Sequence, residues 1–214
     1  MTSLAAVTSP DWPDAQSGEG APVVILLHGY GSHEHDLAGL APLLPESLAW
    51  GSLRAPLAMD FGGSAWFPLD FGDEAPVTQV KAATDAVWAW VDAHVPAAAP
   101  IIALGFSQGG FMALQMLRTR PERLAATVVL AGFTTSGPRP ADDEVASLRP
   151  AVFWGRGDAD QVVPAQMVAQ TSQWMSGHVT VDEQVYPGLA HGIHEEMMAD
   201  VRGYIAGQLA ALTA

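Results

Sequence analysis

The sequence predicts an α/β fold, with a mostly parallel, doubly wound sheet flanked by helices. Three observations lead to this prediction. Short apolar runs rich in valine, isoleucine and leucine alternate along the 214 residues with longer segments of helical periodicity. Glycine, proline or polar residues bound each apolar run, as they bound strands. Strands that alternate with helices of this length form βα units, and these units build parallel sheets.

The start of the chain differs in composition from the rest. Residues 1–21 are rich in proline, serine, aspartate and glycine, and we expect them to form a loosely ordered arm. Residues 22–214 show no internal repeat and no linker long enough to divide them. We therefore expect one domain over residues 22–214, which is long enough to bury a large core.

The elements of this domain follow from periodicity and from turn residues. The predicted strands, in chain order, are 22–29, 100–106, 124–133, 150–158 and 178–188. The predicted helices are 34–44, 76–95, 108–120, 164–175 and 194–212. The helix over 76–95 has the clearest pattern, since it begins at a proline and carries one apolar stripe of Val80, Ala83, Val87, Val91 and Val95.

The composition limits the class of partner. The formal net charge is −14, and Lys81 is the only lysine. Because such a surface repels phosphate backbones and anionic headgroups, we expect no nucleic-acid binding and no electrostatic membrane docking. The apolar stretches are shorter than the roughly 18 residues of a membrane span, and the first residues lack a signal-peptide pattern. We expect a soluble, cytoplasmic protein without stable membrane insertion.

The absence of cysteine excludes disulfides, thiolate metal sites and a cysteine nucleophile.

A serine offers the alternative nucleophile. Residues 105–109 read Gly-Phe-Ser-Gln-Gly and match the pattern G-x-S-x-G between a predicted strand and a predicted helix. A chain that reverses sharply at Ser107 leaves no room for side chains at Gly105 and Gly109. The alternative interpretation is an ordinary strand-to-helix turn that contains a serine.

A serine hydroxyl is a weak nucleophile at neutral pH and needs a base and an acid that orients the base. In sheets of this kind they follow in the order Ser, Asp or Glu, His, each after a strand. Asp160 and His191 occupy these places. Asp158 and His194 are the alternatives, but we expect Asp158 to fix a turn and His194 to lie in the first turn of the last helix.

A metal site is a second interpretation of the histidines. His191 and His194 are spaced i and i+3, but a third ligand is not evident, and "HGIHEE" does not match H-E-x-x-H. The segment "HEHD" (33–36) is explained more simply as the polar start of a helix. We therefore expect no metal.

Two backbone N–H groups are expected to bind the carbonyl oxygen as it becomes charged. One is the amide of Gln108, the residue after the serine. The other is the amide of Tyr30 in the loop "HGYG", where Gly29 and Gly31 allow the backbone to curl. His28 is either a second base or, as we prefer, a brace for this loop.

Taken together, the motifs resemble the phospholipase/carboxylesterase family of α/β-hydrolases, which includes the acyl-protein thioesterases. They read "LLHGYGS", "RAP", "WFPLDFG", "GFSQGG", "GRGDADQVVP" and "YPGLAHGIHEEMMADVRGYI", and the similarity runs from residue 22 to the C-terminus. The resemblance implies an α/β-hydrolase catalytic domain without a large cap domain and without a cofactor. It implies hydrolysis of carboxylic esters or thioesters of small molecules. Several members form dimers, so a homodimer is an expectation.

The resemblance also implies roles for particular residues. Ser107 is expected to be the nucleophile, Asp160 the orienting acid and His191 the base, with Tyr30 and Gln108 as the oxyanion donors. Many relatives carry histidine at the position of Arg156 in "GRGD", and we expect this difference to affect only loop detail.

The predicted function is that of a serine carboxylesterase that acts through an acyl-enzyme. Trp66, Phe67 and Phe71 are expected to line the acyl pocket, with core packing as the alternative. Lysophospholipase or acyl-protein thioesterase activity on the same triad is the first alternative function. A small-molecule binding module that has lost its chemistry is the second.

Overall fold

The computed structural model describes residues 4–14, 20–46, 48–60, 62–69 and 76–212. The main strands are β1 (Ala6–Thr8), β2 (Val23–Leu27), β3 (Ala49–Leu53), β6 (Ile101–Phe106), β7 (Leu124–Leu130), β8 (Ala151–Gly157) and β9 (Thr180–Tyr186). A small hairpin consists of β4 (Leu57–Ala58) and β5 (Ser64–Ala65). The helices are α1 (His35–Ala38), α2 (Val77–His94), α3 (Gln108–Leu117), α4 (Asp142–Leu148), α5 (Ala165–His178) and α6 (Glu195–Leu212).

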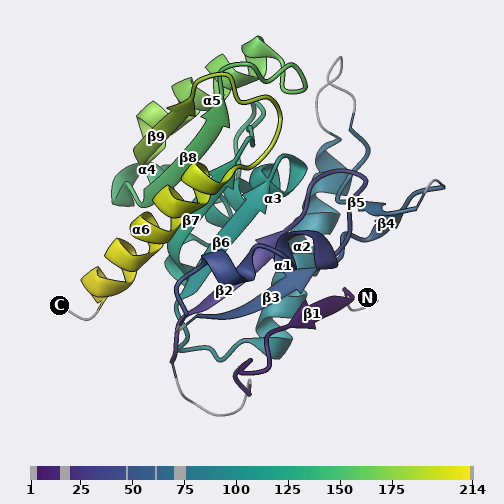
Figure 1. Ribbon diagram of the computed structural model, residues 1–214, viewed down its shortest axis with the longest axis vertical. Helices are drawn as coiled ribbons and strands as arrows, with labels where there is room; N and C mark the ends of the chain where they lie inside the picture. Colours follow the sequence, from purple (N-terminus) through teal and green to yellow (C-terminus); the bar gives the residue numbers. More distant parts are fainter. Residues whose placement is uncertain (1–3, 15–19, 47, 61, 70–75, 213–214) are drawn as a thin grey trace.

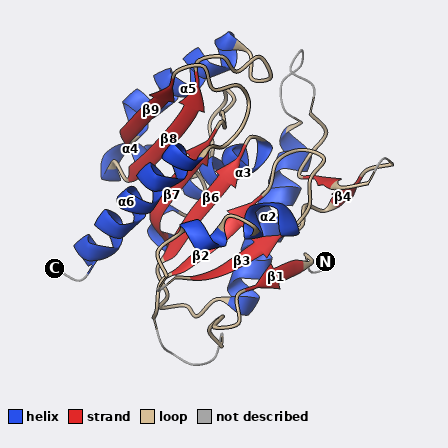
Figure 2. Cartoon of the chain, viewed as in Figure 1, coloured by secondary structure: helices blue, strands red, loops and turns tan. Residues whose placement is uncertain are grey.

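A single twisted sheet runs through the molecule (Figure 1), and it confirms the predicted α/β class. Its strand order is β1-β3-β2-β6-β7-β8-β9. Strand β1 pairs antiparallel with β3, and the other neighbouring strands pair in parallel. Helices lie on both faces of this sheet (Figure 2), as the alternation of strands and helices predicts.

Each face of the sheet is covered by its own set of helices. In β2, Val23, Ile25 and Leu27 belong to a core shared with α2 and α3, whereas Val24 and Leu26 belong to a core shared with α1 and α6. A further core lies between the sheet, α4 and α5. Because central parallel strands are buried on both faces, they read as continuous apolar runs in the sequence.

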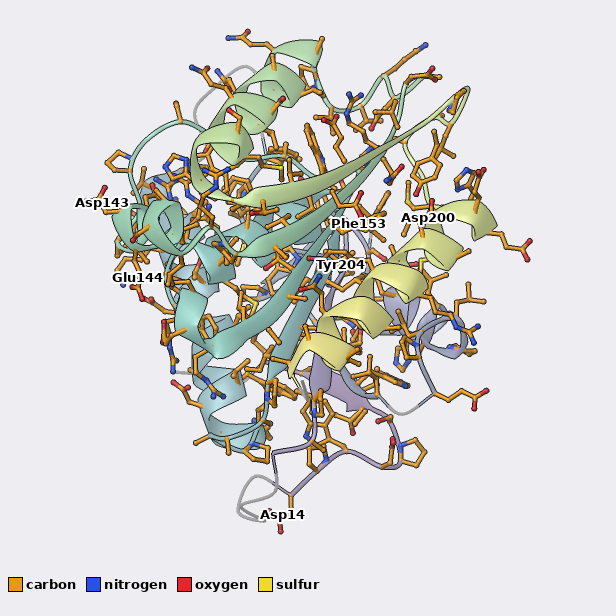
Figure 3. The ribbon with its side chains drawn as sticks, turned by 90° about the vertical axis from the view of Figure 1, so that its left-hand side faces the viewer. Asp14, Asp143, Glu144, Phe153, Asp200 and Tyr204 are labelled. Carbon is orange, nitrogen blue, oxygen red and sulfur yellow. The ribbon has the colours of Figure 1, made fainter. Side chains whose placement is uncertain are left out.

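Helix α6 crosses one face of the sheet next to β8. Figure 3 labels Tyr204 on α6 and Phe153 on β8 where the helix passes over the strands, and their ring centroids are 5.6 Å apart. Burial of the Tyr204 hydroxyl, with the nearby charge of Asp182, raises the pKa of this tyrosine above its usual range. Among the described residues, no helix is both long enough and apolar enough to cross a membrane.

The N-terminal segment differs from the predicted loose arm. Residues 6–8 form the edge strand β1, so the sheet begins ahead of the expected domain boundary at residue 22. Trp12 anchors this segment: its indole lies 5.6 Å from that of Trp90, and its Nε1 donates to the carbonyl oxygen of His94 at 3.0 Å. Composition indicates a loop, but Trp12, which is partly buried, attaches this segment to the buried Trp90 of α2. Residues 1–3 and 15–19 of the predicted arm lie outside the described residues.

Candidate active site

The predicted catalytic side chains follow strands of the same sheet. Ser107 comes directly after β6, Asp160 lies in the loop after β8, and His191 lies in the loop after β9. These strands are parallel and lie within the run β6-β7-β8-β9, so their carboxyl ends reach one edge of the sheet. There the structure brings the three side chains together. Nε2 of His191 is 2.9 Å from Oγ of Ser107, and Nδ1 of His191 is 2.7 Å from Oδ2 of Asp160.

The backbone of Ser107 is strained. Its dihedral angles are φ 54° and ψ −117°, in a region that L-residues rarely adopt. Such a conformation costs about 1–3 kcal/mol and persists only where the surroundings enforce it. Here the amide of Ser107 donates to the carbonyl oxygen of Leu130 at 2.8 Å, and its own carbonyl accepts from the amide of Phe111 at 3.1 Å. These bonds hold the turn from both sides.

The two glycines beside the serine are required by space. A Cβ atom on Gly105 would lie 2.0 Å from the carbonyl oxygen of Gly109. A Cβ atom on Gly109 would lie 1.8 Å from the carbonyl oxygen of Leu27 in β2. Both distances are far below van der Waals contact with rigid backbone atoms. The crowding expected from the G-x-S-x-G pattern is therefore present.

The hydrogen bonds of His191 define its proton positions. A carboxylate only accepts, so Nδ1 of His191 carries the hydrogen and donates to Asp160. Nε2 is then free to accept from the hydroxyl of Ser107. The imidazole lies 5.0 Å from the ring of Phe106, and 15% of its side chain is exposed. The arrangement lets His191 take a proton from Ser107 while Asp160 holds the ring.

Asp160 is oriented by the backbone of its own loop. Its Oδ1 accepts from the amides of Val162 at 2.8 Å and Val163 at 3.2 Å. This leaves Oδ2 for His191. Its side chain is 8% exposed, so solvent competes little for the carboxylate.

The two alternative residues have other partners. Oδ1 of Asp158 accepts from the amide of Gly188 at 2.6 Å, which ties the end of β8 to the turn after β9. Nδ1 of His194 accepts from the amide of Met197 at 3.1 Å, at the start of α6. His194 directly precedes α6 and caps it, whereas the sequence pattern predicts it in the first turn of the helix. Asp158 fixes the neighbouring loop rather than its own turn.

The predicted oxyanion amides belong to adjacent segments. Tyr30 lies in the turn after β2, and Gln108 opens α3 beside Ser107. The Gln108 amide has no acceptor inside the helix, because it belongs to the first turn. Within the described part of the chain, neither amide donates to a protein acceptor, whereas the amide of Gly31 donates to Ser64 at 2.9 Å. Both N–H groups are therefore available to a ligand.

His28 braces the loop that carries Tyr30, which is the role preferred for it in the sequence analysis. Its Nδ1 donates to the carbonyl oxygen of Gly29 at 2.7 Å, and its Nε2 accepts from the amide of Ala55 at 3.1 Å. Burial lowers the pKa of His28 below its ordinary value and keeps the ring neutral. Because both ring nitrogens are occupied, His28 is not placed to act as a second base.

The aromatic residues expected in the acyl pocket are placed differently. Trp66 is 1% exposed and Phe67 is not exposed, and both belong to the core below the site. The ring of Phe67 lies 4.9 Å from that of Phe111 in α3. The prediction that Trp66 and Phe67 contact substrate is therefore corrected: they pack against the sheet and α3. Phe71 lies outside the described residues.

Sequence reasoning missed the role of the Gln108 side chain. Its Oε1 accepts from the amide of Trp66 at 2.9 Å, and its Nε2 donates to the carbonyl oxygen of Phe67 at 2.8 Å. The residue is fully buried. The sequence does contain a signal for this role: Gln108 is a glutamine in a mostly apolar, buried helix, and a buried amide needs hydrogen-bond partners.

Arg156, noted in the sequence analysis as a difference from the family that the motifs resemble, lies in β8. Its guanidinium bonds Glu183 on the neighbouring strand β9, with Nε 2.9 Å and Nη2 2.8 Å from Oε1. It also lies over the ring of Trp154 at 5.3 Å.

The described residues contain no group of three or more His, Asp or Glu side chains that could hold a metal ion.

The sequence resembles known proteins along most of its length. A family model described as Phospholipase/Carboxylesterase matches residues 14–209. Acyl-protein thioesterase 1 of Debaryomyces hansenii is 33% identical over 118 residues, which are 54% of this chain and 51% of that protein. Acyl-protein thioesterase 1 of Kluyveromyces lactis is 25% identical over 209 residues, which cover 87% of this chain and 92% of that protein.

The structure is also similar to solved structures. The Bacillus cereus carboxylesterase superposes with a TM-score of 0.78 at 16% identity, covering 96% of this chain and 94% of that one. This likeness shows the α/β-hydrolase fold. The chain spans about half the length of the first curated relative it matches, 51% for the Debaryomyces hansenii protein.

Proposed function

Because this chain belongs to the phospholipase/carboxylesterase family, we propose that it is a serine hydrolase that cleaves carboxylic esters of small molecules through an acyl-enzyme. One observation carries the proposal. Asp160, His191 and Ser107 form a continuous hydrogen-bonded chain, with contacts of 2.7 and 2.9 Å. A base within this distance of a serine hydroxyl, itself oriented by a carboxylate, is the arrangement that activates serine as a nucleophile.

The reaction has two halves. Oγ of Ser107 attacks the ester carbonyl while its proton passes to Nε2 of His191, and Asp160 stabilises the imidazolium. The amides of Tyr30 and Gln108 bind the oxyanion. The bond to the alcohol oxygen then breaks, and His191 returns the proton to the leaving alcohol. Water, deprotonated by the same imidazole, attacks the acyl-enzyme and releases the acid.

The test is hydrolysis of p-nitrophenyl esters of increasing chain length. The wild type should turn over at least one ester, and Ser107→Ala should lower kcat by about 10⁴-fold or more. Ser176→Ala, an exposed serine in α5, is the control and should keep wild-type kcat. A wild type that hydrolyses no ester in the panel, or a Ser107→Ala variant with wild-type turnover, contradicts the proposal.

A thioester is the second candidate substrate. Three curated relatives are named acyl-protein thioesterase 1, and the proposed triad has the groups needed to cleave a thioester by the same steps. Comparing kcat/KM for acyl-CoA, lysophosphatidylcholine and the p-nitrophenyl esters separates thioesterase, lysophospholipase and carboxylesterase activity. If Ser107 is not labelled by a fluorophosphonate probe, the remaining candidate is a binding module without chemistry.

A further inference from the structure

Trp66 is hydrogen-bonded to both segments that carry the proposed oxyanion amides. Its indole Nε1 donates to the carbonyl oxygen of His28 at 2.8 Å, two residues before Tyr30. Its backbone amide donates to Oε1 of Gln108 at 2.9 Å. The side chains of Trp66, Gln108 and His28 are at most 1% exposed. Solvent therefore does not compete for these bonds.

We propose that Trp66 is a positioning residue that fixes the separation between the amides of Tyr30 and Gln108. The inference rests on the proposed function, because it concerns the oxyanion of that reaction. Donors stabilise an oxyanion when they lie about 2.7–3.1 Å from the oxygen that becomes charged. Since a displacement of about 1 Å can lower a rate about 10²-fold, two donors on separate segments need a common support.

The segment that contains Trp66 also contacts the Tyr30 loop through its backbone. The amide of Ser64 donates to the carbonyl oxygen of Ser32 at 2.7 Å, and the amide of Gly31 donates to the carbonyl oxygen of Ser64 at 2.9 Å. Residues 64–67 therefore form a strip bonded along one edge to the loop over 29–32. The indole bond to His28 extends this attachment to the end of β2.

Gln108 holds the opposite side of the same strip. Its Nε2 donates to the carbonyl oxygen of Phe67 at 2.8 Å, and its Oε1 is already bound to the amide of Trp66. Both ends of the side-chain amide are occupied, which fixes the orientation of the group. Gln108 thus supplies one proposed oxyanion amide from its backbone. Its side chain binds the strip over residues 64–67, which supports the other proposed amide, that of Tyr30.

A packing role for Trp66 makes a different prediction. Its ring lies 5.5 Å from the ring of His28 and fills the core below the site. If packing is its whole role, replacement by a smaller aromatic ring lowers the stability but keeps the catalytic rate. If the hydrogen bond positions the loop, loss of the Nε1–H group lowers the rate as well, because the His28 carbonyl loses its donor and the loop can shift.

Trp66→Phe separates these two roles. It keeps an aromatic ring but deletes the Nε1–H donor and part of the indole, and the control below removes the same atoms from another buried site. We expect kcat for a p-nitrophenyl ester to fall about 10–100-fold while KM stays within about twofold, since the oxyanion develops only in the transition state. The inhibition constant of a boronic acid, whose tetrahedral adduct with Ser107 places an oxygen at the same position, should rise by a similar factor.

Trp88→Phe is the matched control. Trp88 is buried in α2, and its Nε1 donates to Oγ1 of Thr119 at 2.9 Å. Thr119 lies beyond the end of α3 that is opposite to Ser107. The control deletes the same donor from the same type of ring. We expect a lower melting temperature with unchanged kcat and unchanged boronic acid affinity.

Two results overturn the inference: a folded Trp66→Phe protein with wild-type kcat, or one whose kcat and KM change no differently from those of Trp88→Phe. If Trp66→Phe does not fold, Gln108→Met replaces it with the same expected split between kcat and KM. That variant keeps the backbone amide and removes both side-chain bonds. A wild type without esterase activity refutes the proposed function instead, so the two failures are distinguishable.

Discussion

At the scale of single residues, Ser107 holds its hydroxyl in reach of His191 by means of an unfavourable backbone conformation. The conformation is stable because the neighbours leave no alternative: Gly105 and Gly109 are in contact with each other, and Gly109 also touches Leu27 of β2. The position of the proposed nucleophile is thus set by backbone packing, not by the serine side chain. Substitutions that add a single methyl group should therefore be costly here.

Gly109→Ala should destabilise the fold by about 3 kcal/mol or more, because its Cβ would lie 1.8 Å from a backbone oxygen that cannot move without shifting β2. Gly203→Ala, in the exposed middle of α6 with no atom within 4 Å of the new methyl, should instead stabilise by about 0.5–1 kcal/mol. Urea denaturation measures both changes. Equal effects of the two substitutions would show that the contact at Gly109 is not rigid.

At the scale of elements, Arg118 connects the end of α3 to the start of α4. Its guanidinium is 1% exposed and donates to Asp142 through Nε at 2.8 Å and Nη2 at 2.7 Å. Partial burial of Asp142 is the largest single influence on its pKa and opposes its ionisation. The hydrogen bonds from Arg118 and from the amide of Arg139, together with the charge of the Arg118 guanidinium, nevertheless hold the pKa of Asp142 below its usual value. A buried ion pair of this kind is costly to break from one side.

Asp142→Asn should therefore lower the free energy of unfolding by about 2–3 kcal/mol at pH 7. A carboxyl whose pKa is lower in the folded state stabilises the fold above its unfolded pKa of about 3.9, and this stability is lost as the pH falls through the folded value. The difference from wild type should thus be constant between pH 7 and about pH 5 and shrink below about pH 4.

Asp85→Asn is the control for this experiment. Asp85 pairs with Lys81 on the exposed face of α2, and its side chain is 50% exposed. Its removal should cost less than about 0.5 kcal/mol at any pH. A difference between Asp142→Asn and wild type that persists unchanged to pH 3 would contradict the assigned role of the carboxylate.

Elements with a strong local pattern were predictable from the sequence, and those shaped by distant contacts were not. Helix α2 was predicted over 76–95 and runs over Val77–His94, because its apolar stripe is local. Strand β3 was missed: it contains Gly51, where a Cβ would come within 2.9 Å of the ring of Trp12 and 3.0 Å of that of Trp90. The rings of Trp12 and Trp90 occupy the space that a side chain at position 51 would fill. The strand therefore carries a glycine where a local pattern would need an apolar residue.

Two helices show the limits of local signals. The predicted helix over 34–44 is instead α1 (His35–Ala38) and a 3₁₀ turn (Ala41–Leu43), because Gly39 and Pro42 interrupt the pattern. Helix α4 has only seven residues and directly follows the proline- and glycine-rich segment 134–141. The turn signals of that segment led to the prediction of a loop there, and so short a helix has too little periodicity to be recognised.

At the scale of the whole molecule, the order of strands assembles the proposed site. The positions of Ser107, Asp160 and His191 could be predicted because each follows a recognisable strand, and parallel strands end at one edge of the sheet. The contacts between Gln108 and Trp66 could not, since they join segments far apart in the sequence. For the same reason, the sequence did not distinguish aromatic residues in the core from aromatic residues facing a substrate.

The most direct test of the account is to compare kcat of Asp160→Asn and Asp158→Asn on the ester that the wild type hydrolyses fastest. Asn at position 160 no longer holds the Nδ1–H form of His191, so kcat should fall about 10⁴-fold with the fold intact. Asn at position 158 changes only the bond to Gly188 and should leave kcat within about threefold of wild type. Equal kcat values for the two variants, or the larger loss at position 158, would contradict the proposed triad.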